Sequence, residues 1–160
     1  MKEPRSFTRA GRLVATAGTA IILAVALATP GLAQDAAKSI KYRQSAHFLL
    51  GWNIGPLGAM VKGEIPFDAA AAKMRATRLA QVAPMIAEGY PAGSATGAPT
   101  KAKPEIWENM DDFRQKAADL ETTTTKLAAA AETGDLKQIG PALGAVGNAC
   151  KGCHDKYKSD

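Results

Sequence analysis

The chain has 160 residues, the size of one domain, and carries a formal net charge of +5. Much of this charge lies at the start of the chain, in four basic side chains and one acidic side chain: Lys2, Glu3, Arg5, Arg9 and Arg12. Without them the net charge is +2. The positive net charge of the whole chain therefore does not indicate a nucleic-acid partner, and we expect none.

Residues 1–33 are predicted to be a cleaved signal peptide. Their basic start is followed by an apolar run over residues 20–28, then by Pro30 and small residues ending at Ala33. This order is typical of a secretory signal. A membrane anchor is the weaker alternative, because the apolar run is short for a bilayer and Pro30 ends it. Residues 34–160 are then expected to form the mature domain.

The mature part is predicted to be entirely helical. Apolar residues recur three and four residues apart, and no long run alternates with a period of two. The expected helices cover about residues 35–62, 69–88, 104–133 and 136–157, with a long surface loop over 89–103. Four amphipathic helices with short connections predict an all-α fold, an antiparallel four-helix bundle.

Several residues mark the expected helix ends and breaks. Asp68 is expected to cap the second helix, and Gly63 to follow the end of the first. The fourth helix should begin after Asp135. Pro56 should kink or interrupt the first helix, and Pro84 should bend the second.

The sequence Cys150-Lys151-Gly152-Cys153-His154 near the end of the last helix is the C-x-x-C-H attachment motif of a c-type haem. On a helix, these cysteines and the histidine share one face because they are three and four residues apart. Each thiol can form a thioether to a porphyrin vinyl group, and the imidazole can bind the iron. The motif therefore predicts one covalent haem c between facing helices. Since this haem is attached after export, we expect a periplasmic protein.

Other uses of the two cysteines fit less well. A structural zinc needs four protein ligands, and the chain offers only Cys150, Cys153, His47 and His154. A thioredoxin-like redox pair would follow a βαβ pattern, which the sequence lacks. A disulfide within one helical turn would constrain almost nothing. A haem-less structural bundle or metal binder is the alternative from a different class of protein.

The mature sequence resembles the class II cytochromes c, that is, the cytochromes c-prime and their low-spin relatives. Four segments carry the resemblance: 150–158, 41–46, 61–68, and 104–107 followed by Phe113. The family also has its haem motif near the C-terminus. The resemblance implies a left-handed four-helix bundle with the haem near one end. It also implies a possible homodimer through the first two helices, as in many members.

Specific roles follow from the resemblance. It implies His154 as the proximal iron ligand and Cys150 and Cys153 as the thioether residues. Arg43 matches an arginine beside the haem propionates. Three further positions match a basic residue near the proximal histidine and two aromatic residues around the pocket: Lys158, Trp107 and Phe113.

The position four residues after Arg43 sets the spin state in that family, and here it is His47. High-spin members have an apolar or aromatic side chain there, whereas low-spin members have a methionine that binds the iron. His47 departs from both patterns. It could bind the iron as a sixth ligand, because imidazole is a common haem ligand. It could instead line an open distal pocket and hydrogen-bond a ligand or water.

In a third interpretation, kinking near Pro56 turns His47 away and leaves Phe48 or Leu50 over the iron. Met60 and Met85 are weaker candidates for a sixth ligand, because a methionine on a helix face usually packs in the core.

These features predict a haem protein that carries single electrons between periplasmic redox partners. A bis-His iron suits this role because its coordination shell hardly changes. The alternative is a five-coordinate haem protein that binds nitric oxide or carbon monoxide. We do not expect an enzyme, because no second set of acid–base or nucleophilic groups converges by spacing.

Overall fold

The computed structural model describes residues 30–160, where the chain forms six helical segments and no β-strand. The predicted signal peptide lies outside the described residues, apart from its last four residues, where α1 begins. The segments are α1 (Pro30–Lys62), α2 (Ala69–Val82), α3 (Met85–Glu88), α4 (Glu105–Glu108), α5 (Met110–Glu132) and α6 (Leu136–Tyr157). One isolated antiparallel bridge pairs Ala102 with Lys158.

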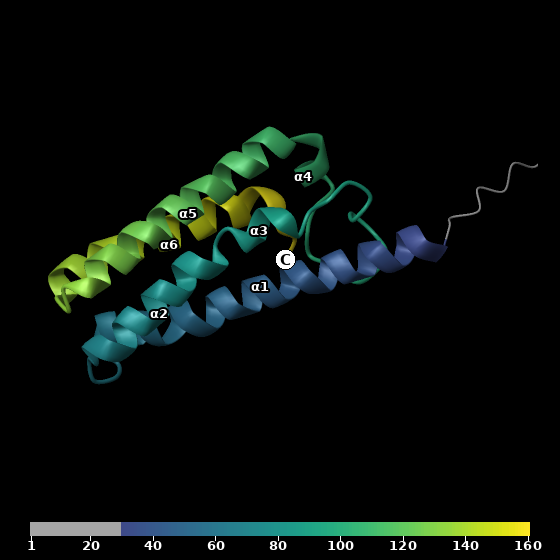
Figure 1. Cartoon of the computed structure of the whole chain (residues 1–160). Coiled ribbons are helices and arrows are strands. Elements are labelled where there is room, and N and C mark those ends of the chain that lie inside the picture. The colour runs from purple at the N-terminus through teal and green to yellow at the C-terminus, as the bar shows by residue number, and fades with distance from the viewer. Residues whose placement is uncertain (1–29) are drawn as a thin grey trace, which may run out of the picture.

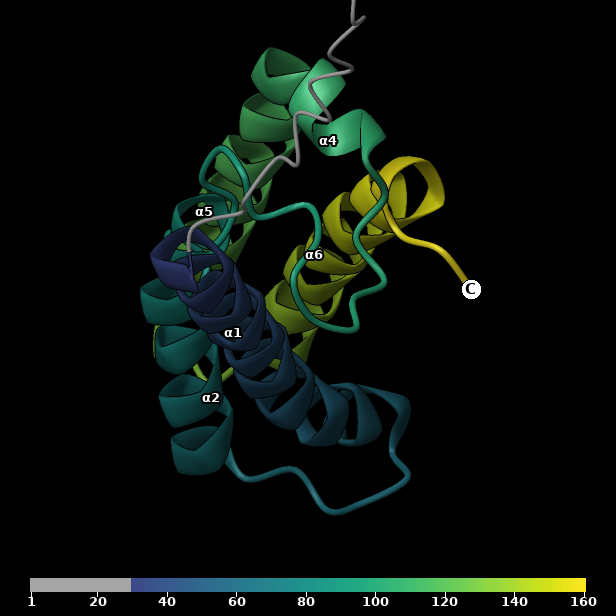
Figure 2. The ribbon, with the colours of Figure 1, turned by 90° about the vertical axis from the view of Figure 1, so that its right-hand side faces the viewer.

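The four long helices form an antiparallel bundle (Figures 1 and 2). α1 packs on α2, α2 on α5, α5 on α6, and α6 returns to α1. The loop after α3 and the short helix α4 lie at the same end of the bundle, and the loop runs beside the first half of α1 (Figure 1). The prediction of an all-α four-helix bundle is confirmed.

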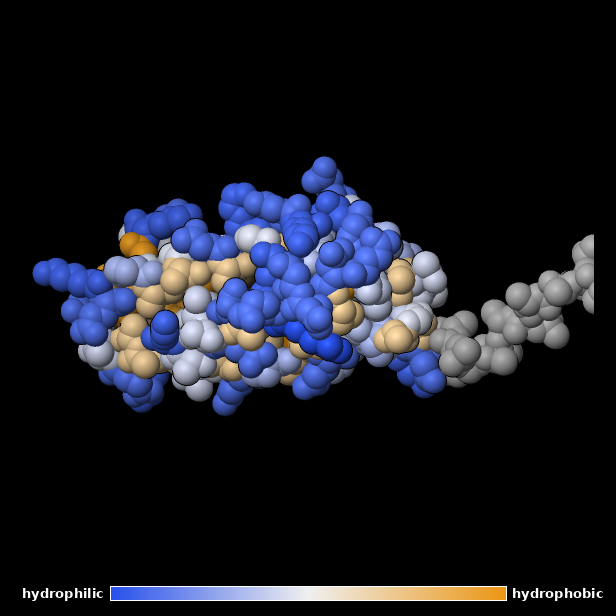
Figure 3. Space-filling view, turned by 90° about the horizontal axis from the view of Figure 1, so that it is seen from above, coloured by the Kyte–Doolittle hydropathy of each residue, from blue (hydrophilic) through white to orange (hydrophobic). Residues whose placement is uncertain are grey.

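The core consists of apolar side chains contributed by each long helix. The largest fully buried ones include Leu57, Leu79, Phe113, Leu127 and Ile139. Viewed from above, the surface is mostly hydrophilic, with scattered apolar patches (Figure 3). Such a division between an apolar stripe and a polar outer face is what drives helix packing in water. Among the described residues, no helix is long and apolar enough to cross a membrane.

The helix ends follow the local sequence. The side chain of Asp68 accepts a hydrogen bond from the Ala71 N–H at 3.0 Å, and Asp135 accepts one from the Lys137 N–H at 2.8 Å. Gly63 follows α1 with φ at +74°, a conformation that favours glycine. The predicted ends at these three residues are confirmed.

Three details of the helices differ from the prediction. α1 begins at Pro30, earlier than the expected start near 35, because proline suits the first position of a helix. α1 also continues through Pro56, so of the two expected effects, a kink or an interruption, the interruption is wrong. Pro56 cannot donate to the carbonyl of Trp52, and Nη1 of Arg75 on α2 donates to that oxygen instead, at 3.2 Å. Two of the expected helices are each divided: the second at Ala83 and Pro84 into α2 and α3, where a bend was expected, and the third at Asn109 into α4 and α5.

Leu127 offers a test of the core. Replacing this fully buried side chain by alanine leaves a cavity between the helices, so Leu127→Ala should lower the free energy of unfolding by about 2–5 kcal/mol. The exposed neighbour provides the control, and Lys126→Ala should change that free energy by less than about 0.5 kcal/mol. Denaturant unfolding of the haem-loaded proteins measures both. Equal stability of the two variants would contradict this packing.

Candidate functional site

A cavity of about 620 Å³ opens at the end of the bundle that carries the long loop. α1, α5, α6 and the loop after α3 contribute to its wall, which is mainly apolar. Its volume falls within the range of about 300–1,000 Å³ that is usual for ligand and cofactor sites. Leu50, Ile54, Ile106 and Val146 are among the apolar residues that line it.

Cys150, Cys153 and His154 all line this cavity from α6. Both cysteines are half-buried free thiols, and burial raises the pKa of each. Burial also lowers the pKa of His154, with a further contribution from the charge of His47. His154 therefore stays neutral at neutral pH, which is the form that binds a metal. The structure thus brings together on one wall the three residues of the C-x-x-C-H motif.

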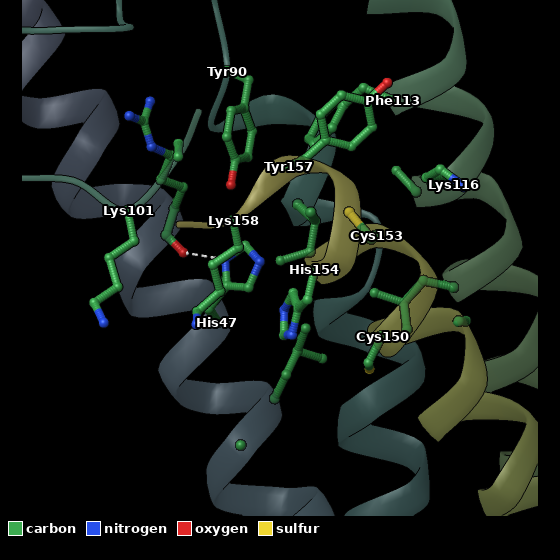
Figure 4. Close-up of a pocket in the computed structure, with 18 of the residues that line it drawn as sticks. His47, Tyr90, Lys101, Phe113, Lys116, Cys150, Cys153, His154, Tyr157 and Lys158 are labelled. Carbon is green, nitrogen blue, oxygen red and sulfur yellow. Dashed lines mark hydrogen bonds between the residues drawn. The ribbon is translucent and has the colours of Figure 1, made fainter. Parts of the chain in front are cut away.

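His47 projects from α1 into the same cavity and faces His154 (Figure 4). The two ring centroids are 6.2 Å apart and the rings are inclined by 34°. Nδ1 of His47 lies 2.8 Å from the carbonyl oxygen of Arg43. Because a carbonyl oxygen only accepts, Nδ1 carries the proton and Nε2 is left with a free lone pair.

The spacing of the two imidazoles fits a metal ion between them. Two metal–nitrogen bonds of about 2.0–2.1 Å, with half a ring on each side, place the centroids about 6 Å apart. The separation of His47 and His154 matches this requirement. A hydrogen bond from the second ring nitrogen to a backbone carbonyl, as His47 makes, is the usual support of a metal-bound histidine.

Arg43 is a buried cation at the mouth of the site, with only 2% of its surface exposed. Its Nη1 donates to the carbonyl oxygens of Gly89 and Ser94 at 3.3 and 3.0 Å and to the Ser94 hydroxyl at 3.2 Å. Its Nη2 donates to the Thr100 hydroxyl at 3.0 Å. All of these acceptors are neutral. A buried cation held in this way fits a site where a carboxylate of the cofactor completes its environment.

Aromatic rings surround Arg43 and close the wall of the cavity on its side. The guanidinium carbon lies 4.8 Å from the ring centre of Tyr90 and 5.4 Å from that of Trp107. Tyr90 packs in turn on Phe113, with ring centroids 4.5 Å apart. The hydroxyl of Tyr90 points into the space beside the two histidines (Figure 4). Burial raises the pKa of Tyr90 to about 12, although the charge of Arg43 acts in the opposite direction.

The structure brings most of the predicted site residues together. Phe113 and Lys158 line the cavity with the cysteines and histidines, whereas Trp107 stands behind Arg43 and donates to the Pro91 carbonyl oxygen at 3.0 Å. Sequence reasoning missed Tyr90. Its only signal was a single aromatic residue in a loop otherwise rich in glycine, proline and alanine.

The other candidates for the distal side lie elsewhere. The side chain of Phe48 is 66% exposed, and neither Met60 nor Met85 lines the cavity. Leu50 does line it, but His47 is not turned away as the third interpretation required.

Comparison with known proteins identifies the family of this chain. The model of the family described as Cytochrome C' matches residues 38–158. The chain is 38% identical over 125 residues to cytochrome c' from Rubrivivax gelatinosus, covering 78% of this chain and 97% of that protein. The chain belongs to the cytochrome c' family. Like the rest of this family, it binds haem c covalently.

Solved structures of cytochromes c' share this fold. Cytochrome c prime from Shewanella frigidimarina superposes with a TM-score of 0.75 at 41% identity, covering 78% of this chain and 97% of that chain. A variant of cytochrome c prime from Alcaligenes xylosoxidans, in complex with nitric oxide, gives 0.72 at 35% identity, with the same coverage. The family match and these structures therefore agree on a haem-binding four-helix bundle.

The pKa of Tyr90 leads to a test at alkaline pH. The folded state keeps this phenol neutral up to about pH 12, whereas the unfolded chain loses the proton near pH 10. Between these values the stabilising contribution of Tyr90 declines as pH rises, by roughly 2–3 kcal/mol at most. The free energy of unfolding of the haem-loaded wild type should therefore fall more steeply than that of Tyr90→Phe. Denaturant unfolding at several pH values measures both slopes, and equal slopes would contradict a buried neutral phenol.

Proposed function

We propose that this protein is a periplasmic carrier of single electrons whose haem iron is bound by His154 on one side and His47 on the other. The observation that carries the proposal is the 6.2 Å spacing of the two imidazoles, with Nδ1 of His47 held by the carbonyl oxygen of Arg43. In this assignment the unprotonated Nε2 is the atom that binds the metal.

The remaining residues hold the cofactor. Cys150 and Cys153 would form the thioether bonds, and the guanidinium of Arg43 would pair with the propionates. Lys158 supplies a second positive charge near His154, whose pKa it helps to lower. The apolar wall keeps water from the macrocycle. When bound, the haem supplies an iron centre that takes up and releases one electron.

Two fixed protein ligands suit electron transfer rather than catalysis. Both imidazoles come from helices, α1 and α6, which would hold the two ligands in fixed positions during one-electron exchange. Catalysis at the iron would require an open coordination position, which this arrangement closes. We therefore infer a non-enzymatic role, in which the protein exchanges electrons with redox partners after export through the signal at residues 1–33.

Binding of a diatomic gas is the second candidate function. It is favoured by the nitric oxide complex of the Alcaligenes xylosoxidans relative. In this chain, nitric oxide or carbon monoxide would have to compete with His47 for the iron.

The identity of the sixth ligand can be read from optical spectra. The ferric and ferrous wild type should be low-spin, and the ferrous spectrum should change little with carbon monoxide, because His47 occupies the iron. His47→Ala should become high-spin and bind carbon monoxide readily. Ser45→Ala, on the exposed side of the same helical turn, should keep the wild-type spectra. A high-spin wild type that shifts with carbon monoxide would reject the electron-carrier proposal in favour of gas binding.

We also propose that two copies associate through α1 and α2. Phe48 and Trp52 stack on each other on the outer face of α1, with ring centroids 6.0 Å apart. They are 66% and 63% exposed, and Met74 on α2 is also exposed. Covering large aromatic side chains releases the most free energy, because they remove the most apolar area from water.

Trp52→Glu should convert the proposed dimer to a monomer, because a carboxylate would have to be buried against the second copy. Leu136→Glu provides the control, since Leu136 is an exposed apolar residue at the start of α6. Analytical ultracentrifugation of the haem-loaded proteins measures the mass. A monomeric wild type, or a dimer that survives Trp52→Glu, would contradict the proposed interface.

A further inference from the structure

Gly89 at the end of α3 lies directly against the backbone of Arg43 on α1. A Cβ added at Gly89 would lie 2.5 Å from the Cβ of Arg43 and 3.1 Å from its Cα. These atoms cannot swing aside as the end of a flexible side chain could. The φ of Gly89 is −75°, which any residue adopts. Glycine is therefore needed at this position for space and not for conformation.

The segment that begins at Gly89 also holds the side chain of Arg43. The carbonyl oxygen of Gly89 accepts from Nη1, and Ser94 and Thr100 supply the other acceptors. The segment therefore meets Arg43 at both ends of the residue, at its backbone through Gly89 and at its guanidinium through the hydrogen bonds.

The backbone of Arg43 in turn holds the side chain of His47 through a hydrogen bond. Its carbonyl oxygen accepts the hydrogen bond from Nδ1 of His47, one helical turn further on. A displacement of the α1 backbone at Arg43 would therefore move the imidazole and change its direction relative to His154.

We propose that Gly89 is a positioning residue for His47, because its close approach sets how near α1 comes to the haem iron. This inference rests on the proposed function, since it requires His47 to bind the iron. A Cβ at Gly89 would need about 0.5 Å of extra space to reach 3.0 Å, the shortest separation that real Cβ atoms show. Metal–ligand distances tolerate only about 0.2 Å. Gly89 thus controls the sixth ligand although it does not line the cavity.

Gly89→Ala tests this coupling by spectroscopy of the haem-loaded protein. The variant should lose most of the low-spin ferric signal. Its ferrous form should bind carbon monoxide at least about tenfold faster, because a displaced ligand no longer competes effectively. Added imidazole should restore the low-spin spectrum. Gly58→Ala is the matched control, since Gly58 lies on α1 and a Cβ there meets nothing within 4 Å. It should keep the wild-type spectrum and carbon monoxide kinetics.

The outcomes separate this inference from the proposed function. A high-spin wild type would overturn the proposed function, and the role of Gly89 with it. If the wild type is low-spin and His47→Ala is high-spin, a low-spin Gly89→Ala would overturn only the role of Gly89. A high-spin Gly89→Ala that imidazole fails to restore would also overturn it, because the site as a whole would then be lost.

A second variant covers the case in which Gly89→Ala does not fold, as judged by circular dichroism. Ser94→Ala combined with Thr100→Ala removes two hydroxyl acceptors from Arg43 and adds no atom against α1. The spectrum of this variant should move toward high spin, by less than the change expected for Gly89→Ala. An unchanged spectrum would overturn the proposed coupling.

Discussion

The charged guanidinium of Arg43 lies inside the protein, where the loop after α3 meets α1. Burying a charge is costly unless it is hydrogen-bonded, and here neutral oxygens of the loop accept from both Nη1 and Nη2. The loop has little regular structure of its own. Its shape depends on this residue and on the donors of Gln44 and Trp107, which bind the carbonyl oxygens of Pro99 and Pro91. One buried cation therefore orders the end of the bundle where the cavity lies.

The same residue links the loop to the chemistry of the site. The guanidinium of Arg43 lies where a cofactor carboxylate would complete its environment, and its carbonyl oxygen fixes Nδ1 of His47. His154 approaches from α6, a helix that also carries both cysteines. The two proposed iron ligands thus belong to helices on opposite sides of the cavity. Small adjustments of α1 against its neighbours would then change the coordination of the iron without changing the covalent attachment.

The bundle leaves room for the cofactor because its four pairs of neighbouring helices do not pack equally closely. α5 packs closely on α6 and α2, whereas α1 and α6 touch least. Gly51 on α1 and Gly147 on α6 line the cavity on this open side. Small residues there let the cavity reach between the helices, while large apolar residues such as Leu127 and Ile139 fill the rest of the core.

The sequence by itself determined the features that depend on near neighbours in the chain. The spacing of Cys150, Cys153 and His154, the cap at Asp68 and the turn at Gly63 are local, so short-range rules predict them. The tertiary structure decided what depends on distant residues. The approach of Gly89 to Arg43 and the facing of His47 and His154 each bring together segments far apart in the chain. Such contacts arise only when the helices pack, because helical periodicity gives the face of a residue but not the residue opposite it.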